Sequence, residues 1–307
     1  MDFDILICDD FKNICTNEKI AVIENKKVIS FLNDFEDGKW RTSKFNNFIW
    51  DNIADTALNY QERQALFDKS HQKLVAAAKS LRFANESDEI GRGSEVAEIM
   101  LYAIMNNYYK ALPVVPKIYY KQNSQDNAKG ADSVHIVIDG EEYSLWFGEA
   151  KFFNSLNDSN FYQITNSLYN ALQTDKLKKE NSLILGVSDL QYLGLSENVV
   201  EKIRKDLSPR NSIDSIKPLI NVPIMVLHEC EITSNTTIYS NEYCDSIKEM
   251  YSDKINSYFY KQYNKLKDLH LYSNIKFHLI LFPVPNKEQI INKFLKAVEF
   301  YKDGAID

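Results

Sequence analysis

Strands that alternate with helices along most of the chain predict an α/β fold, in which a mixed central β-sheet is flanked by helices on both faces. Two segments support this fold class most directly. Residues 129–153 contain two runs of alternating residues on either side of Asp139-Gly140, a strong two-residue loop signal, and so predict an antiparallel hairpin. Residues 94–110 are apolar on nearly every side, which predicts a helix buried against other elements.

The remaining elements follow in order along the chain. Residues 1–60 are expected to form a small α+β region ahead of a main domain at residues 61–307, which closes with a strand and a helix. Further strands are expected at residues 20–24, 27–32, 182–187, 222–228 and 275–282. Further helices are expected at residues 59–83, 160–178, 196–207, 242–269 and 287–301.

The N-terminal region contains a conspicuous aromatic segment. Its members are Trp40, Phe45, Phe48 and Trp50. These side chains could fill the core or could form a docking surface for a partner. Core packing is the interpretation that we favour, because large apolar side chains are more often buried than exposed.

The hairpin places charged residues at its end remote from the turn. With Asp139-Gly140 as the loop, Asp132 is expected to lie opposite Phe147 and diagonal to Glu149. Side chains in a strand alternate between faces, so Lys151 shares the face of Glu149. His135 is expected to point to the other face, opposite Ser144.

Two carboxylates and a lysine at the edge of a sheet are typical of a metal-dependent site that cleaves phosphodiesters. Mg²⁺ prefers oxygen ligands and often binds one or two carboxylates together with water. Lys151 could orient the attacking water or stabilise the developing anion. The alternative is a solvated strand end, since acid-x-Lys triplets arise often by chance. The shared face of Asp132 and the preceding helix favour the site.

The helix at residues 94–110 carries two glutamates one turn apart, Glu95 and Glu98. Glu95 fits an exposed first turn, where the helix dipole favours a carboxylate. Glu98 lies beside the apolar run, where a carboxylate is costly unless it is paired or bound to metal. Glu98 is therefore the better candidate ligand, although the sequence leaves both open.

The order of these acidic residues resembles the PD-(D/E)xK nuclease superfamily. More narrowly, the segments GSEVAEIMLYAI, KGADSVHIVIDG and LWFGEAKFF resemble the HamA family of the Hachiman antiphage defence system. The shared pattern is Gly-x-Asp-x-x-His followed by Gly-Glu-Ala-Lys. In this chain it consists of Gly130, Asp132, His135, Gly148, Glu149, Ala150 and Lys151.

This resemblance implies a restriction-endonuclease-like core and a Mg²⁺-dependent DNA endonuclease, with Mn²⁺ able to substitute. It also implies a separate helicase subunit, HamB-like, as partner. Asp132 and Glu149 would hold the metal, Lys151 would serve the nucleophile, and Glu98 would complete the ligands. Some relatives carry Gln-x-x-x-Tyr on the next helix; Gln163 and Tyr169 are spaced differently, which makes exonuclease-type relatives poorer guides.

The net charge of −7 argues against an autonomous DNA-binding protein. Lys117, Lys121 and Lys129 flank the expected site and are candidate DNA contacts, or else form a solvated face. An acidic nuclease is coherent if a partner supplies DNA affinity. The alternative is a non-catalytic regulatory or adaptor subunit that keeps the fold and binds a helicase or nucleic acid.

Composition predicts a cytoplasmic protein that does not enter a membrane. The N-terminus has no basic stretch ahead of its short apolar run, and no segment approaches the roughly 18 apolar residues of a membrane span. The four cysteines lack zinc-type spacing and indicate no disulfide framework.

Overall fold

A seven-stranded mixed sheet forms the centre of the molecule in the computed structural model, which describes residues 2–81, 93–115, 118, 130–186, 190 and 192–303. Across the sheet, the strands are β1 (Asp4–Asp10), β2 (Lys26–Leu32), β9 (Lys276–Val284), β8 (Ile220–Glu229), β7 (Glu142–Phe153), β6 (Ser133–Asp139) and β5 (Leu112–Val115). The inner four strands, β2, β9, β8 and β7, run parallel, whereas β1, β6 and β5 join antiparallel. Strands β3 (Phe35–Glu36) and β4 (Lys39–Trp40) form a separate small pair.

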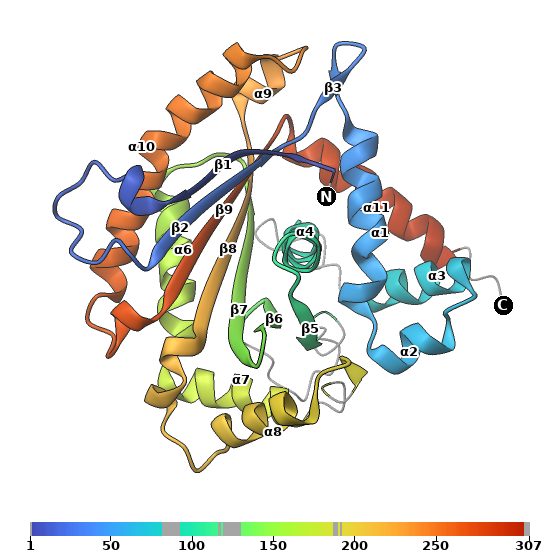
Figure 1. Cartoon of the computed structure of the whole chain (residues 1–307). Coiled ribbons are helices and arrows are strands. Elements are labelled where there is room, and N and C mark those ends of the chain that lie inside the picture. The colour runs from blue at the N-terminus through green and yellow to red at the C-terminus, as the bar shows by residue number, and fades with distance from the viewer. Residues whose placement is uncertain are drawn as a thin grey trace.

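Helices cover both faces of this sheet, which confirms the predicted fold class (Figure 1). One face carries α6 (Asp158–Ala171) and α10 (Asn241–Leu266), and the other carries α4 (Ser94–Asn107). Outside α4 lie α1 (Thr42–Ala57), α2 (Tyr60–Ala65), α3 (Ser70–Ser80) and α11 (Lys287–Asp303). The remaining helices are α7 (Thr174–Gly186), α8 (Glu197–Asp206) and α9 (Glu231–Asn235).

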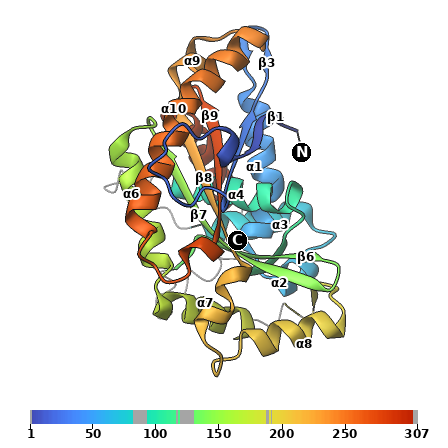
Figure 2. The ribbon, with the colours of Figure 1, turned by 60° about the vertical axis from the view of Figure 1, so that its left-hand side comes forward.

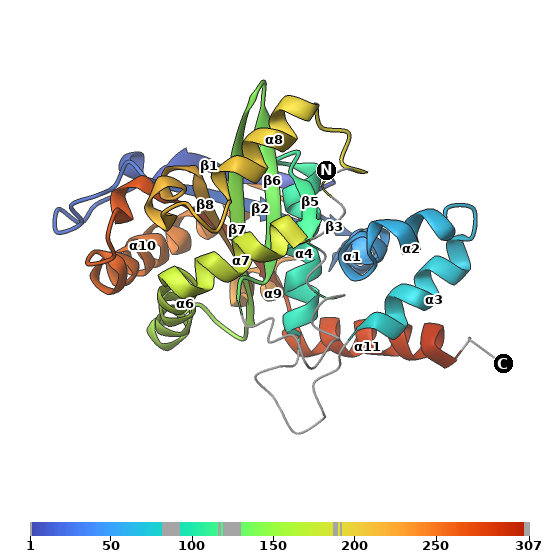
Figure 3. The same cartoon turned by 90° about the horizontal axis from the view of Figure 1, so that it is seen from below.

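The layers can be followed from two directions. Figure 2 shows α6 and α10 on one side of the strands and α1, α3 and α4 on the other. Figure 3, seen from below, shows α4 between the sheet and the group of α1, α2, α3 and α11. Each face buries its own apolar cluster, so Leu145 of β7 packs with the α6 and α10 side and Trp146 with the α4 side. The alternation of β7 therefore decides which layer each of its side chains meets.

The predicted buried helix is confirmed as α4. Its residues from Val96 to Met105 are all buried, because β7 and β8 lie against one side and α1 against another. A helix that is apolar all round has no preferred solvent face, so burial on several sides is the arrangement that stabilises it. Glu98 is the single charged residue within this buried stretch.

The predicted hairpin is confirmed, but its register was wrong by two residues. Gly140 adopts a left-handed φ of 62° and occupies the first loop position, so the loop is Gly140-Glu141. Asp139 stays in the strand and pairs with Glu142, and Ser133 pairs with Gly148. A shift of two residues keeps every side chain on its predicted face.

Other predicted elements were wrong in detail. The strand expected at residues 182–187 is helical as far as Gly186, because Leu177, Asn181 and Ile184 are buried at helical spacing in α7. The helices expected at 59–83 and 160–178 each break into two, and residues 20–24 form no strand.

The N-terminal region contributes to the central sheet. Strand β2 pairs in parallel with β9, so a strand from the start of the chain lies beside one from near its end. Trp40, Phe45 and Phe48 of the aromatic segment are buried, which confirms packing for these three. The role of residues 1–60 in docking a partner stays a prediction. Among the described helices, none is both long and apolar enough to cross a membrane.

Candidate active site

The sheet opens at the point where β6 and β7 separate. Their pairing ends at Ser133 and Gly148, and one further hydrogen bond runs from the Asp132 amide to the Gly148 carbonyl at 2.7 Å. Beyond it, residues 149–153 of β7 pair with β8 on one side and with no described strand on the other. The corrected register places Asp132 level with Glu149 rather than diagonal to it.

Lys151 joins the two carboxylates of this open edge. Its Nζ lies 2.5 Å from Glu149 Oε1 and 3.9 Å from Asp132 Oδ2. Asp132 also contacts the backbone, since the Ala150 amide donates to Asp132 Oδ2 at 2.9 Å. Asp132 is thus fixed to the strand that carries Glu149 and Lys151, and the three predicted residues converge.

Of the two glutamates on α4, Glu98 belongs to this cluster. Glu98 is 6% exposed, and its charge helps to raise the pKa of Lys151. Glu95 is half-buried in the first turn, and its charge acts instead on Lys302 of α11. Since no described strand pairs with this edge of β7 beyond Glu149, the charge of a side chain from α4 can act on Lys151.

The pKa values of Glu149 and Lys151 respond to burial and to each other's charge. Burial raises the pKa of Glu149 to about 7, and the charge of Asp132 adds to the rise. The charge of Lys151 and a hydrogen bond from Ser167 act in the opposite direction and lower the pKa. Burial alone would lower the pKa of Lys151, but attraction to Glu149 and Asp132 is stronger and raises it. Glu149 is thus repelled by Asp132 and attracted by Lys151 within the same buried space.

The donor chemistry fits Mg²⁺, which takes oxygen ligands such as the Glu98, Asp132 and Glu149 carboxylates. In the described part of the chain, however, no three acidic, histidine or cysteine side chains are already grouped as metal ligands. The ammonium group of Lys151 contacts the carboxylates of both Glu149 and Asp132. A metal ion held by these oxygens would require Lys151 to move aside.

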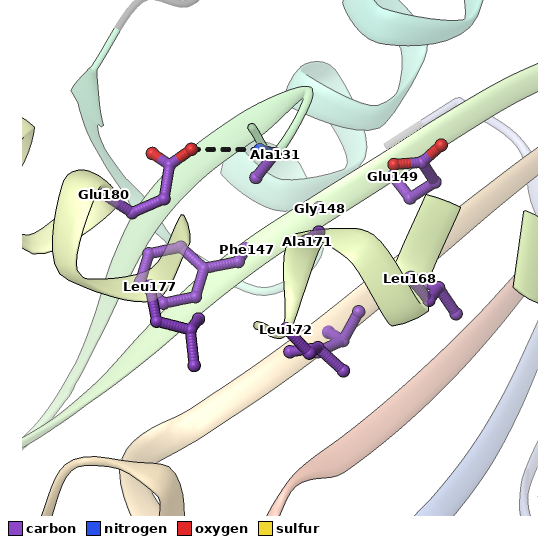
Figure 4. Close-up of a pocket in the computed structure, with 10 residues that line it drawn as sticks. Ala131, Phe147, Gly148, Glu149, Leu168, Ala171, Leu172, Leu177 and Glu180 are labelled. Atoms are coloured by element: carbon purple, nitrogen blue, oxygen red, sulfur yellow. Dashed lines mark hydrogen bonds between the residues drawn. The ribbon is translucent and has the colours of Figure 1, made fainter. Parts of the chain in front are cut away.

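Helices α6 and α7 contribute side chains to the surroundings of Glu149. Figure 4 shows Glu149 with Leu168 and Ala171 of α6, Leu172 directly after this helix, and Leu177 and Glu180 of α7. These residues line a cavity of about 10 Å³, near the lower limit for one water molecule. Glu180 is buried, and its Oε1 accepts a hydrogen bond from the Ala131 amide at 3.0 Å.

His135 is not part of the cluster. It lies opposite Trp146, not Ser144 as predicted, and is fully buried on the α4 side, with its ring 4.7 Å from that of Tyr102. Burial lowers its pKa to about 3, so it stays neutral. The histidine of the sequence pattern is therefore a core residue.

Gln163 is exposed on α6, whereas Ser167, one turn later, bonds Glu149. The sequence did not single out Ser167 or Glu180. The sequence does contain a signal for Glu180, because this carboxylate falls at helical spacing between the apolar residues Leu177 and Ile184. The candidate DNA contacts Lys117, Lys121 and Lys129 lie outside the described residues.

A larger groove, of about 960 Å³, lies at the other end of β7. Its floor includes Trp146 and His278, whose ring centroids are 4.4 Å apart, and Tyr109, which is 4.7 Å from Trp146. His278 Nε2 bonds the Asn221 side-chain oxygen at 2.9 Å. Five acidic and two lysine side chains line the groove, so its charge is net negative.

Comparison with known proteins identifies the family. The HamA family model matches residues 9–298, which include every element of the charged cluster. A search of curated proteins finds no match. The chain belongs to the HamA family and is a component of the Hachiman defence system.

Proposed function

We propose that this HamA-family chain is a Mg²⁺-dependent DNA endonuclease of the cytoplasm that works together with a helicase subunit. The observation that carries the proposal is the convergence of Glu98, Asp132 and Glu149 around Lys151 at an open sheet edge. Carboxylate oxygens grouped at a buried site are the ligands that Mg²⁺ prefers. This arrangement therefore favours a metal-dependent reaction over a purely structural ion pair.

Each residue has a distinct part in this reaction. Asp132, Glu149 and Glu98 would hold Mg²⁺, which supplies a Lewis acid that lowers the pKa of water and neutralises phosphate charge. Glu149, whose pKa is near 7, releases its proton when it becomes a ligand, so binding of the metal should strengthen as the pH rises. Lys151, displaced from the carboxylates, would orient the attacking water or stabilise the pentacovalent transition state.

The acidity of the chain supports the helicase as partner. With a net charge of −7, the chain gains little affinity for DNA from long-range electrostatics. A helicase that already holds DNA would supply this affinity and would restrict cleavage to DNA that it has engaged. Mn²⁺ is expected to substitute for Mg²⁺, because it accepts the same oxygen ligands.

A second candidate function is a non-catalytic regulatory or adaptor subunit. Lys151 bridges Glu149 and Asp132 as a structural ion pair would, and this observation favours the alternative. The two functions differ in what they require of the lysine. A nuclease needs Lys151 for cleavage, whereas an adaptor needs it only for stability.

The test is cleavage of plasmid DNA by the purified chain, alone and with its candidate helicase, in Mg²⁺ or EDTA. Lys151→Ala is compared with Lys178→Ala, which removes an exposed lysine of α7. Mg²⁺-dependent cleavage that only Lys151→Ala abolishes would support the nuclease. Cleavage that appears only with the helicase would mean that the partner gates it. Absence of cleavage in every combination would favour the adaptor.

A further inference from the structure

Glu180 touches the backbone that leads into Asp132, although it lies 48 residues further along the chain. Its Oε1 accepts from the Ala131 amide at 3.0 Å. Figure 4 shows this bond beside Glu149, with Glu180 reaching from α7 toward the start of β6. The contact therefore ties α7 to the residue that immediately precedes Asp132.

The same carboxylate accounts for Gly130 in the sequence pattern. A Cβ added to Gly130 would collide with Glu180 Oε1. The backbone of Gly130 is not in the left-handed region, so its conformation would tolerate alanine. The carboxylate of Glu180, and not a turn, is what leaves no space for a side chain at position 130.

We infer that Glu180 is a positioning residue, which holds the Gly130–Ala131 backbone so that Asp132 lies level with Glu149. Asp132 has two backbone attachments to β7, through its amide to Gly148 and its carboxylate to Ala150. Both depend on the path of the chain just before Asp132, and Glu180 fixes that path. This inference rests on the proposed function, because it takes Asp132 as a metal ligand.

Groups that orient metal ligands from outside typically change metal affinity by about 10- to 100-fold when they are removed. Glu180→Ala should therefore weaken Mn²⁺ binding by about this factor. Glu180→Gln should lose less than about five-fold, because its amide oxygen still accepts the Ala131 N–H, without the added strength of a charged acceptor. Binding is measured by calorimetry on the full chain, so it does not depend on cleavage.

Leu177→Ala is the matched control for a merely structural effect. Leu177 lies on the same helix and lines the same cavity, but it makes no hydrogen bond to the β6 backbone. This variant should lower thermal stability and leave the Mn²⁺ affinity within about two-fold. If Leu177→Ala and Glu180→Ala weaken binding equally, Glu180 only supports the packing of α7, and the inference is overturned.

The collision at Gly130 allows a second test by a double-mutant cycle. Gly130→Ala should weaken Mn²⁺ binding as Glu180→Ala does, because the new methyl group displaces the carboxylate. With Glu180→Ala already present, the methyl group has space, and Gly130→Ala should add less than about two-fold. Effects that add in full would contradict the inference.

Failure of the inference and failure of the proposed function give different results. If the wild-type chain binds Mn²⁺ and Glu180→Ala binds it equally well, the positioning role is wrong and the nuclease proposal stands. If the wild-type chain binds no Mn²⁺ and cleaves no DNA, the proposed function itself is wrong. Rescue of binding by glutamine, but not by alanine, is the result that supports Glu180.

Discussion

The two ends of β7 bury titratable groups in opposite ways. At one end, Glu149 and Lys151 form a charged cluster with Asp132 on the α6 and α10 side. At the other end, the ring of His278 packs at a tilt against Trp146 on the α4 side and carries no charge, since burial lowers its pKa to about 3. Burial is the main cause of the pKa shift in both regions, but it leaves a neutral histidine at one end and a group of interacting charges at the other.

The difference shows that a shifted pKa alone does not mark an active site. The shift of His278 comes first from burial, and the nearby Lys27 and Lys276 reinforce it, so the ring becomes a neutral core group. The shift of Glu149 also comes first from burial, but it is reinforced by a second carboxylate and opposed by a lysine. The convergence of several charged side chains, and not burial by itself, distinguishes the candidate site.

The largest effect should come from Lys151→Ala. Cleavage should fall by about 10²- to 10³-fold, the usual cost of removing one group that stabilises the transition state. Binding of Mn²⁺ should stay equal or become tighter, because the ammonium group no longer occupies the space between the carboxylates. Plasmid cleavage and calorimetry on the same protein measure both effects. Loss of metal binding in this variant would contradict the displacement of Lys151 by the metal.

At the aromatic end, Trp146→Ala should act on stability instead. Removal of its buried ring, which packs on Tyr109 and His278, should lower the free energy of unfolding by about 3–5 kcal/mol. Chemical denaturation measures this loss. The Mn²⁺ affinity of the folded protein should remain unchanged; a parallel loss of affinity would mean that the two ends of β7 are coupled.

The charge of Glu149 should make stability depend on pH. Its pKa is raised from the ordinary 4.5 to about 7 in the folded state, so its contribution is full below pH 4.5 and is lost as the pH rises through 7. The size is about 3 kcal/mol at most. Buried histidines such as His278 have lowered pKa values and give the opposite slope below about pH 6.5.

The difference between the wild type and Glu149→Gln isolates this contribution. Urea denaturation of both proteins in EDTA, between pH 5 and 8, should show the wild type losing stability relative to the variant as the pH rises. Mg²⁺ should reduce the loss, because it neutralises the ionised cluster. A difference that does not change with pH would contradict the raised pKa of Glu149.

The smallest expected effect is the difference in Mn²⁺ affinity between variants of the two glutamates of α4. Glu98→Gln should weaken Mn²⁺ binding by about 10-fold or more, whereas Glu95→Gln should change it by less than about two-fold. Both variants remove one charge from the same helix, so each controls for the other. Equal effects in calorimetry would mean that Glu98 is not a ligand.

The sequence predicted the parts of the site that are close in the chain. Alternation placed Glu149 and Lys151 on one face, and the buried helix identified Glu98. The register was wrong by two residues, because the Asp-Gly signal does not say which residue adopts the left-handed φ. Residues 182–187 were assigned to a strand because a short apolar run fits the period of a strand as well as that of a helix.

What the sequence could not show were contacts between distant elements. Glu180 meets Ala131 across 49 residues, and its place depends on how α7 packs below the sheet. The pairing of β2 with β9 is equally invisible in local patterns, because a parallel pair needs a crossover of undefined length. Such contacts follow from the packing of the whole chain rather than from any segment.

The pairing of β2 with β9 also has a consequence for synthesis on the ribosome. Asn25, just ahead of β2, bonds Ile275, 250 residues later. Translation proceeds at about 5–20 residues per second, so β9 emerges roughly 10 to 50 seconds after β1 and β2. During that time the edge of β2 is open to other strands, so newly made chains should depend on chaperones until translation is nearly complete.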